Sequence, residues 1–155
     1  MKTKVKSRSN PQEAVIEALN QLLADALVLK LNAKQAHWNV KGPNFLTLHE
    51  LFDKVATAVD GYADELAERA VQLGGYAEGT LHNIGRRSSV AAHPANTASS
   101  AAHVKAIASQ LRALADEARA AIDETAALGD AVTADILTGI TGGLDTLRWF
   151  VESHS

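Results

Sequence analysis

The chain has 155 residues, enough for one domain with its own hydrophobic core. Apolar residues make up 46% of it and aromatic residues only 5%, which favours closely packed helices over a β-sheet. There is no cysteine, which excludes disulfides and thiolate metal sites and is compatible with a reducing cytoplasm. No apolar run approaches the roughly 20 residues that span a bilayer, and no apolar stretch follows the polar N-terminus, so neither a membrane anchor nor a secretory signal is expected.

Charge is unevenly distributed along the chain. The net charge is −3, yet four of the fifteen basic residues lie before residue 9, namely Lys2, Lys4, Lys6 and Arg8. The remaining residues hold eleven basic and eighteen acidic side chains, a balance of −7. An acidic body suits cation handling, and a basic arm suits contact with a polyanion. We therefore expect a flexible basic arm over residues 1–10 and a helical domain over residues 11–155.

Two long helices are predicted in the first half of the domain. The first covers about residues 10–38, because Asn10 is a good N-cap and Pro11 suits the first helical position. Apolar residues then recur at helical spacing. The second covers about residues 44–73 and ends at Gly74-Gly75, a typical C-terminal signal.

The second half begins with a long connection over residues 76–99, in which a short helix is predicted near residues 81–84. Two further long helices follow, over about residues 98–127 and 131–152. Gly142-Gly143 lies inside the last of them, where each glycine costs about 1 kcal/mol relative to alanine unless another segment approaches closely. Two long helices, a long crossover with a short helix and two more long helices predict an all-α, ferritin-like four-helix bundle.

Metal-capable side chains follow one face of the second predicted helix. His49 and Asp53 are four residues apart, as are Asp64 and Glu68, and eleven residues separate Asp53 from Asp64. Eleven residues are close to three helical turns of about 3.6 residues each, so all four share a face. At a rise of about 1.5 Å per residue, the two pairs lie roughly 16 Å apart along the axis and cannot share one ion. One chain therefore has two half-sites.

An antiparallel copy of the same helix would join the half-sites. The residue numbers of His49 and Glu68 add up to 117, and so do those of Asp53 and Asp64. A two-fold axis near residues 58 and 59 would therefore place each residue of a pair opposite its counterpart in the other chain. We predict a metal site between subunits, on the outside of the bundle, with His37 as a further candidate ligand.

Imidazole nitrogens and carboxylate oxygens form a ligand set that suits iron(II), and zinc or manganese could also enter it. Simpler interpretations exist for each part. Asp64 with Glu68 could be a solvated face, His49 with Asp53 a surface ion pair, and His37 a hydrogen-bonded residue at a helix end. The Glu-x-x-His motif of ordinary di-iron bundles is absent from the sequence. The shared face and the paired numbering favour a metal site over these alternatives.

The residues around these positions resemble the Dps family, the DNA-binding proteins from starved cells also called mini-ferritins. The similar segments cover residues 34–45, 48–53, 64–75 and 133–138, with Trp149-Phe-Val-Glu152 near the end. The resemblance extends over about residues 11–153. It implies a cytoplasmic, hollow dodecamer, associated with the nucleoid if DNA is bound.

The same resemblance implies ferroxidase centres that oxidise iron(II), preferentially with hydrogen peroxide, and a ferric mineral stored inside the shell. At most two irons would occupy each centre. One subunit would provide His37, His49 and Asp53, and its partner would provide Asp64 and Glu68. Trp38 matches a tryptophan beside the centre that quenches radicals, and it could equally anchor the helix end in the core. A structural, DNA-compacting protein with an inactive or zinc-occupied site is the alternative function.

Other charged residues have two interpretations each. By the resemblance, Asp130 and Asp135 could line a pore through which iron enters, with Asp123 and Glu124 as weaker candidates, or they could serve as helix N-terminal charges. The basic arm, Lys2, Lys4, Lys6 and Arg8, could bind DNA phosphates without reading sequence, or could be a solubilising terminus. Arg69 is expected to orient carboxylates or to pair across an interface. The remaining histidines, His82, His93, His103 and His154, match no ligand spacing and are expected at the surface.

Overall fold

The structure is a computed structural model that describes residues 10–155. It contains five helices and no strand within those residues, which confirms the all-α prediction. Their bounds are α1, Pro11–Asn39; α2, Phe45–Gln72; α3, Leu81–Arg87; α4, Ser100–Ala127; and α5, Ala131–Glu152. Each predicted long helix is present within two residues of its expected limits, and the predicted short helix extends three residues further.

Local side-chain chemistry explains where most of the helices begin. Asn10 accepts a hydrogen bond from the backbone N–H of Gln12 and caps α1, with Pro11 in the first turn as predicted. Thr80, Ser99 and Asp130 cap α3, α4 and α5 in the same way. The N-cap residue of α2, Asn44, makes no such bond. At its other end α2 stops at Gln72, and the chain turns away at Gly74, whose φ of +84° is available to glycine without strain.

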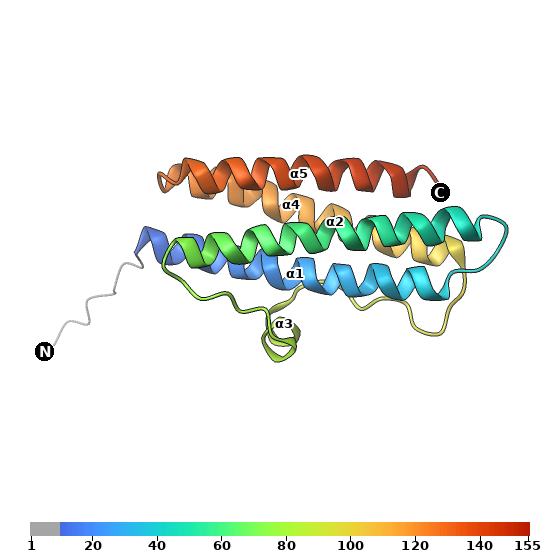
Figure 1. Ribbon diagram of the computed structural model, residues 1–155. Coiled ribbons are helices and arrows are strands. Elements are labelled where there is room, and N and C mark those ends of the chain that lie inside the picture. The colour runs from blue at the N-terminus through green and yellow to red at the C-terminus, as the bar shows by residue number, and fades with distance from the viewer. Residues whose placement is uncertain (1–9) are drawn as a thin grey trace, which may run out of the picture.

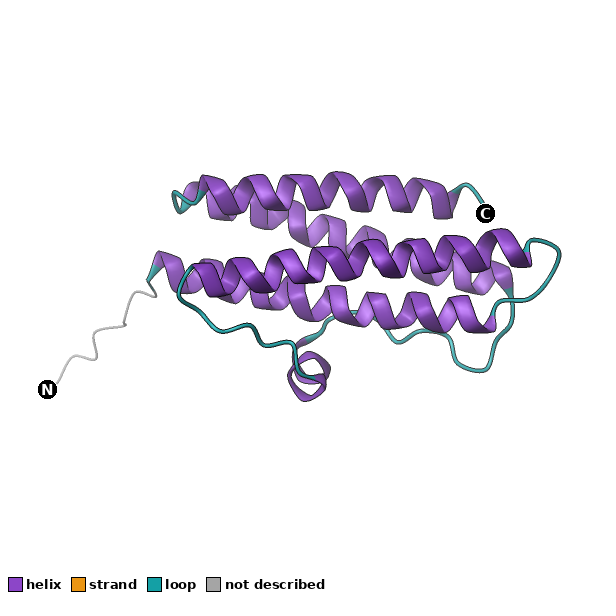
Figure 2. Cartoon of the chain, viewed as in Figure 1, coloured by secondary structure: helices purple, strands orange, loops and turns teal. Residues whose placement is uncertain are grey.

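The four long helices form an elongated bundle of two hairpins (Figure 1). α1 and α2 run antiparallel and pack together, as do α4 and α5. The segment from residue 73 to residue 99 runs along the outside of α1 from one end of the bundle to the other and includes α3 (Figure 2). Because this crossover spans the bundle, α2 and α4 run parallel, which is the predicted ferritin-like connection.

The core is mainly apolar and contains many alanines, so the helices can approach closely. Leu19 and Leu29 of α1, Phe52 and Val59 of α2, and Leu111 of α4 are among its fully buried side chains. Val59 belongs to this core, so a two-fold contact near residues 58 and 59 would use the opposite, solvent-facing side of α2. No helix in the described part of the chain is long and apolar enough to cross a membrane.

The glycine pair within α5 has an asymmetric role. A β-carbon added to Gly143 would overlap the hydroxyl group of Tyr62 on α2, whereas one added to Gly142 would meet nothing within 4 Å. Close approach is therefore the reason for Gly143, although a side chain rather than a backbone approaches it. The hydroxyl lies where α2 meets α5, and burial raises the pKa of Tyr62, with a smaller contribution from Glu65. The structure gives no reason for Gly142.

Candidate metal half-sites

The two histidines predicted as ligands lie face to face where α1 ends and α2 begins. The rings of His37 and His49 are stacked, with centroids 3.7 Å apart and planes inclined by 17°. His37 Nδ1 lies 2.7 Å from the carbonyl oxygen of His49, and His49 Nδ1 lies 2.7 Å from the carbonyl oxygen of His37. A carbonyl oxygen can only accept, so each Nδ1 must carry the hydrogen.

This reciprocal pair fixes the chemistry of both rings. When Nδ1 donates to a carbonyl, neutral imidazole keeps its lone pair on Nε2, the form and orientation in which histidine binds a metal ion. Both side chains are partly exposed, so the Nε2 atoms are not enclosed by the core. His37 is thus a hydrogen-bonded residue at a helix end, as the simpler interpretation expects, and its bond also preserves a ligand nitrogen.

Asp53 lies one turn beyond His49 on α2 and forms an ion pair with Lys34 of α1. Their nitrogen and oxygen atoms are 2.7 Å apart. The hydrogen bond from Lys34 lowers the pKa of Asp53, and the nearby histidines act in the same direction. The carboxylate is therefore ionised near neutral pH, as metal binding requires, but one oxygen already has an ammonium partner that a metal ion would have to displace.

The acidic pair lies further along the same helix and, unlike Asp53, has no charged partner within residues 10–155. Asp64 and Glu68 are both exposed, and neither makes an ion pair or a side-chain hydrogen bond within residues 10–155. Asp64 borders a groove of about 580 Å³ between α1, α2 and the start of the crossover, with Leu27, Gly61 and Thr80 among its lining residues. The acidic half-site is thus open, with no group of the described chain neutralising it.

All five predicted ligand residues lie on the outside of the bundle, and none lines its core. Within residues 10–155 of one chain, no three His, Asp or Glu side chains come together closely enough to hold one metal ion. The structure brings His37, His49 and Asp53 to one end of the exposed face of α2. Asp64 and Glu68 are on the other side of its midpoint.

Trp38 follows His37 but does not enter the core. Its side chain is 64% exposed, and the ammonium group of Lys34 lies 5.8 Å from the centre of its ring. The interpretation of Trp38 as a core anchor is therefore wrong for the single chain. An exposed indole of this size is typical of a surface that another molecule covers.

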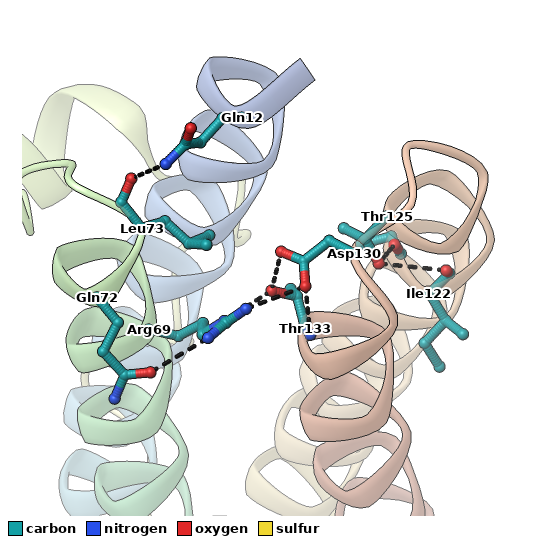
Figure 3. A network of polar contacts seen from close by, with 9 residues as sticks. Gln12, Arg69, Gln72, Leu73, Ile122, Thr125, Asp130 and Thr133 are labelled. Carbon is teal, nitrogen blue, oxygen red and sulfur yellow. Dashed lines mark hydrogen bonds and ion pairs between the residues drawn. The ribbon is translucent and has the colours of Figure 1, made fainter. Parts of the chain in front are cut away.

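Arg69 and Asp130 form a polar network between the end of α2 and the start of α5 (Figure 3). Arg69 donates to Asp130 at 3.0 Å and to the hydroxyl of Thr133 at 2.9 Å. Asp130 also accepts the backbone N–H of Thr133 at 2.9 Å and so caps α5. Burial alone would raise the pKa of Asp130. The hydrogen bonds from Thr133 and Arg69 outweigh burial and lower this pKa. Arg69 thus orients a carboxylate, as expected, within its own chain.

The remaining predictions have mixed outcomes. Asp135 is exposed on α5, as are Asp123 and Glu124 on α4. His82 and His154 are exposed as expected, whereas the prediction for His103 is wrong, because it is 1% exposed and bonded to the half-buried His93. The basic arm, Lys2, Lys4, Lys6 and Arg8, lies outside the described residues.

Comparison with known proteins agrees with this architecture. Residues 16–155 match the ferritin-like domain family. The chain is 41% identical to the DNA protection during starvation protein of Agrobacterium fabrum, over 99% of this chain and 94% of that one. Among solved structures, Dps from Microbacterium arborescens in the high iron form has a TM-score of 0.87 and 34% identity, covering 97% of both chains. A Dps protein from Bacillus brevis has a TM-score of 0.89 and 33% identity, over 95% of this chain and 98% of that one.

The bundle topology and the domain match define a ferritin-like protein. The similarity to the Agrobacterium protein over nearly the full length of both chains narrows the class further, and the chain belongs to the Dps family.

Proposed function

We propose that this protein oxidises iron(II) at centres shared between two subunits and stores the ferric product within a closed homo-oligomer. His37, His49 and Asp53 of one subunit would bind the metal together with the partner's Asp64 and the partner's Glu68. The observation that supports this most strongly is the reciprocal histidine pair. Its hydrogen bonds leave two ligand nitrogens free beside the ionised Asp53, which shares a face of α2 with an acidic pair that has no partner among residues 10–155.

Apolar residues at the ends of α2 support the antiparallel pairing. Leu46 is 61% exposed and Val71 is 55% exposed, and their residue numbers also add up to 117. The axis that joins the half-sites would therefore bring Leu46 against the partner's Val71 and remove both from water. The groove beside Asp64 provides room for side chains of the second copy.

The chemistry assigned to the centre follows from its ligands. Two imidazoles and three carboxylates bind iron(II), and the hard, anionic carboxylates favour the more highly charged product. Placing two iron(II) ions together allows one hydrogen peroxide to take one electron from each. With two protons, the products are two iron(III) ions and two waters, so the oxygen–oxygen bond breaks without releasing a hydroxyl radical. The preference for peroxide over dioxygen rests on the family resemblance.

Storage and DNA protection are proposed from the relatives. The Microbacterium Dps was solved in a high iron form, and the Agrobacterium relative is named for DNA protection during starvation. We propose a hollow dodecamer in which Trp38 lies beside the centre and quenches radicals. A cytoplasmic location, close to the nucleoid when DNA is bound, would accompany this function. The arm over residues 1–10 would contact DNA phosphates, with an affinity that falls as salt rises.

For the pore through which iron enters, Asp135 is the better of the two leading candidates. It is exposed, whereas Asp130 is engaged by Arg69 and Thr133 within its own chain. The alternative function, a DNA-compacting protein whose site holds zinc or is inactive, has the same ligand residues and differs in whether iron is oxidised.

Subunit mixing tests the shared centre directly. One variant, His37→Ala with His49→Ala, lacks the imidazole half-site, and another, Asp64→Asn with Glu68→Gln, lacks the acidic half-site. Each alone should lose peroxide-dependent iron(II) oxidation. When the two are unfolded together and reassembled, half of the two-fold pairs are mixed and each has one intact centre, so about a quarter of wild-type activity should return.

A matched control distinguishes loss of ligands from loss of charge. Glu65→Gln changes an exposed carboxylate between the two acidic ligands and should leave oxidation unchanged. If mixing restores nothing although the mixed oligomers form, the centre is not shared between subunits. If the parent variants oxidise iron as fast as wild type, the enzyme function is wrong and the structural alternative gains support.

A further inference from the structure

The crossover is attached to the bundle by buried polar side chains of α1. Asn20 is 3% exposed, donates to the carbonyl of Tyr76 and accepts the N–H of Glu78, both at 2.9 Å. Asp25 is 1% exposed and binds Ser88 and Ser89. α3 lies between these two attachment points, so the crossover is fixed on both sides of it.

Asp25 makes an unusually complete set of hydrogen bonds for a buried carboxylate. One oxygen accepts the hydroxyl of Ser88 and the backbone N–H of Ser89, both at 2.7 Å. The other accepts the side-chain N–H of Gln21 at 2.9 Å and the hydroxyl of Ser89 at 3.1 Å. Donors on every side favour the ionised form, and a charge in this position depends on them.

Glu117 of α4 lies beside the same carboxylate, and the two groups shift each other's pKa. Two carboxyl groups can form a hydrogen bond only with a proton between them. Burial, the hydrogen bond and repulsion from Asp25 raise the pKa of Glu117 to about 7. Burial opposes ionisation of Asp25 as well, but the bonds from Ser88, Gln21 and Glu117 outweigh it and lower the pKa of Asp25. Glu117 therefore holds the proton.

Nearby cations are already engaged elsewhere. On α3, the guanidinium of Arg87 pairs with Glu17 and Glu78. On α4 itself, Arg119 pairs with Asp116 and with Asp145 of α5. Asp25 of α1 is the charged group that acts on Glu117. Ionisation of Glu117 would thus place two carboxylates side by side with no described cation to compensate them.

We propose that Asp25 and Glu117 form a proton-dependent clasp that holds the end of α3 and the segment after it against the bundle, and that the clasp weakens when Glu117 ionises. An open crossover would let water reach Glu117 and lower its pKa from about 7 toward the ordinary value of 4.5, although Asp25 would stay beside it. For an acid whose pKa is raised by folding, the stabilisation is complete below the lower pKa and is lost as pH rises through the higher one.

Hydrogen exchange of the metal-free, full-length oligomer tests this clasp. The N–H of Ser89 donates directly to Asp25, so its protection reports on closure. After correction for the intrinsic pH dependence of exchange, wild-type protection around Ser89 should fall about tenfold or more between about pH 5.5 and 7.5. Glu117→Gln retains a donor toward Asp25 but has no titrating proton there. Its protection around Ser89 should therefore stay constant across this pH range. Glu124→Gln, an exposed change on the same helix, should follow wild type.

Infrared spectroscopy of wild type gives a test that needs no variant to fold. A protonated carboxyl band should be present below neutral pH and disappear as pH rises through about 7. No such band, or the same pH profile in wild type and Glu117→Gln, would overturn the proposal.

One consequence rests on the proposed function. The start of the crossover, including Ala77 and Thr80, lines the groove beside Asp64, and Thr80 caps α3, so a shift of α3 when the clasp opens should alter docking of the second copy at the acidic half-site. The pH dependence of iron oxidation should then differ between wild type and Glu117→Gln. If neither protein oxidises iron while hydrogen exchange still distinguishes them, the proposed function fails and the clasp stands. If both oxidise iron with one pH profile while exchange differs, the coupling to the site fails.

Discussion

Two histidine pairs in this chain have nearly parallel rings but differ in ring separation, with centroids 3.7 Å apart in one pair and 5.1 Å in the other, and in their hydrogen bonds. His37 and His49 are stacked with planes 17° apart, and His93 and His103 with planes 15° apart. In the first pair each ring donates to a backbone carbonyl and keeps Nε2 free at the surface. In the second pair the rings bond to each other at 2.9 Å, and His103 donates to the carbonyl of Thr97.

The difference shows that the choice of hydrogen-bond partner determines what an imidazole can do. His103 is fully buried, with one nitrogen used by Thr97 and the other by His93, so no lone pair remains for a metal ion. The rings of His37 and His49, the outer pair, are each held through one nitrogen only. His93 and His103, the inner pair, form a structural link between the crossover and α4 because His103 is buried. The outer pair is exposed and is therefore a candidate for metal ligation.

The largest expected effect is on metal affinity. His49→Ala should weaken binding of zinc, used as a redox-inert probe, by about 100-fold or more, because it removes one ligand nitrogen and the ring that stacks against His37. His93→Ala should leave the affinity within about twofold, because its ring lies in the inner pair. Isothermal titration calorimetry of both variants checks this. Equal losses in the two variants would contradict the division of roles between the pairs.

For the free energy of unfolding we expect the reverse, with the larger loss when a ring of the inner pair is removed. His103→Ala removes a fully buried ring with two hydrogen bonds and should destabilise the protein by about 2–4 kcal/mol. His37→Ala removes a partly exposed ring and should cost about 1 kcal/mol or less. Denaturant unfolding followed by circular dichroism measures both, with the exposed His82→Ala as a control for histidine loss. A larger cost for His37→Ala would mean that the outer pair is the structural one.

The inner pair should also add a pH dependence of defined sign. Burial, together with His103, lowers the pKa of His93 below its ordinary value of 6.5. A base whose pKa is lowered by folding stabilises the protein above its unfolded pKa, and this contribution is lost as pH falls from about 6.5 toward the folded value. The slope should be at most about 1.4 kcal/mol per pH unit.

Glu117 titrates in the opposite direction over an overlapping range, so the measurement belongs in a Glu117→Gln background. There, His93→Gln should flatten the acid side of the curve of thermal unfolding midpoint against pH. An unchanged curve would show that His93 does not titrate with unfolding.

The sequence predicts helix limits well and the partners of buried polar groups poorly. The starts of α1 and α5 follow from Asn10, Pro11 and Asp130, because capping acts within a few residues of the chain. The exposed face of α2 could be predicted because one helix determines it. The hydrogen bonds between His37 and His49 could not, because they depend on how α1 and α2 meet.

The burial of polar residues is harder to predict from sequence, since their hydrogen-bond partners come from distant segments. His103 was expected at the surface, yet it shares the apolar stripe of α4 with Ile107, four residues later. Asp25 likewise lies between Leu22 and Leu29 on the buried face of α1. A polar residue on an apolar stripe was the available signal, but only the path of the crossover shows what satisfies it.

The smallest predicted effect distinguishes two lysines one turn apart on α1. Lys34 pairs with the candidate ligand Asp53, and Lys30 pairs with Asp60, which is not a predicted ligand, each at 2.7 Å. Lys34→Gln removes a cation that competes with the metal, and an exposed ion pair is worth about 0.2–1 kcal/mol, so zinc affinity should rise roughly two- to fivefold. Lys30→Gln loses the same charge one turn away on α1 but frees no ligand, so zinc affinity should change less in this variant.

Calorimetric titrations at low and high salt separate a local effect from general charge repulsion, because screening reduces the latter. If both variants gain equally and salt abolishes the gain, Lys34 acts through net charge and its contact with Asp53 does not limit metal binding.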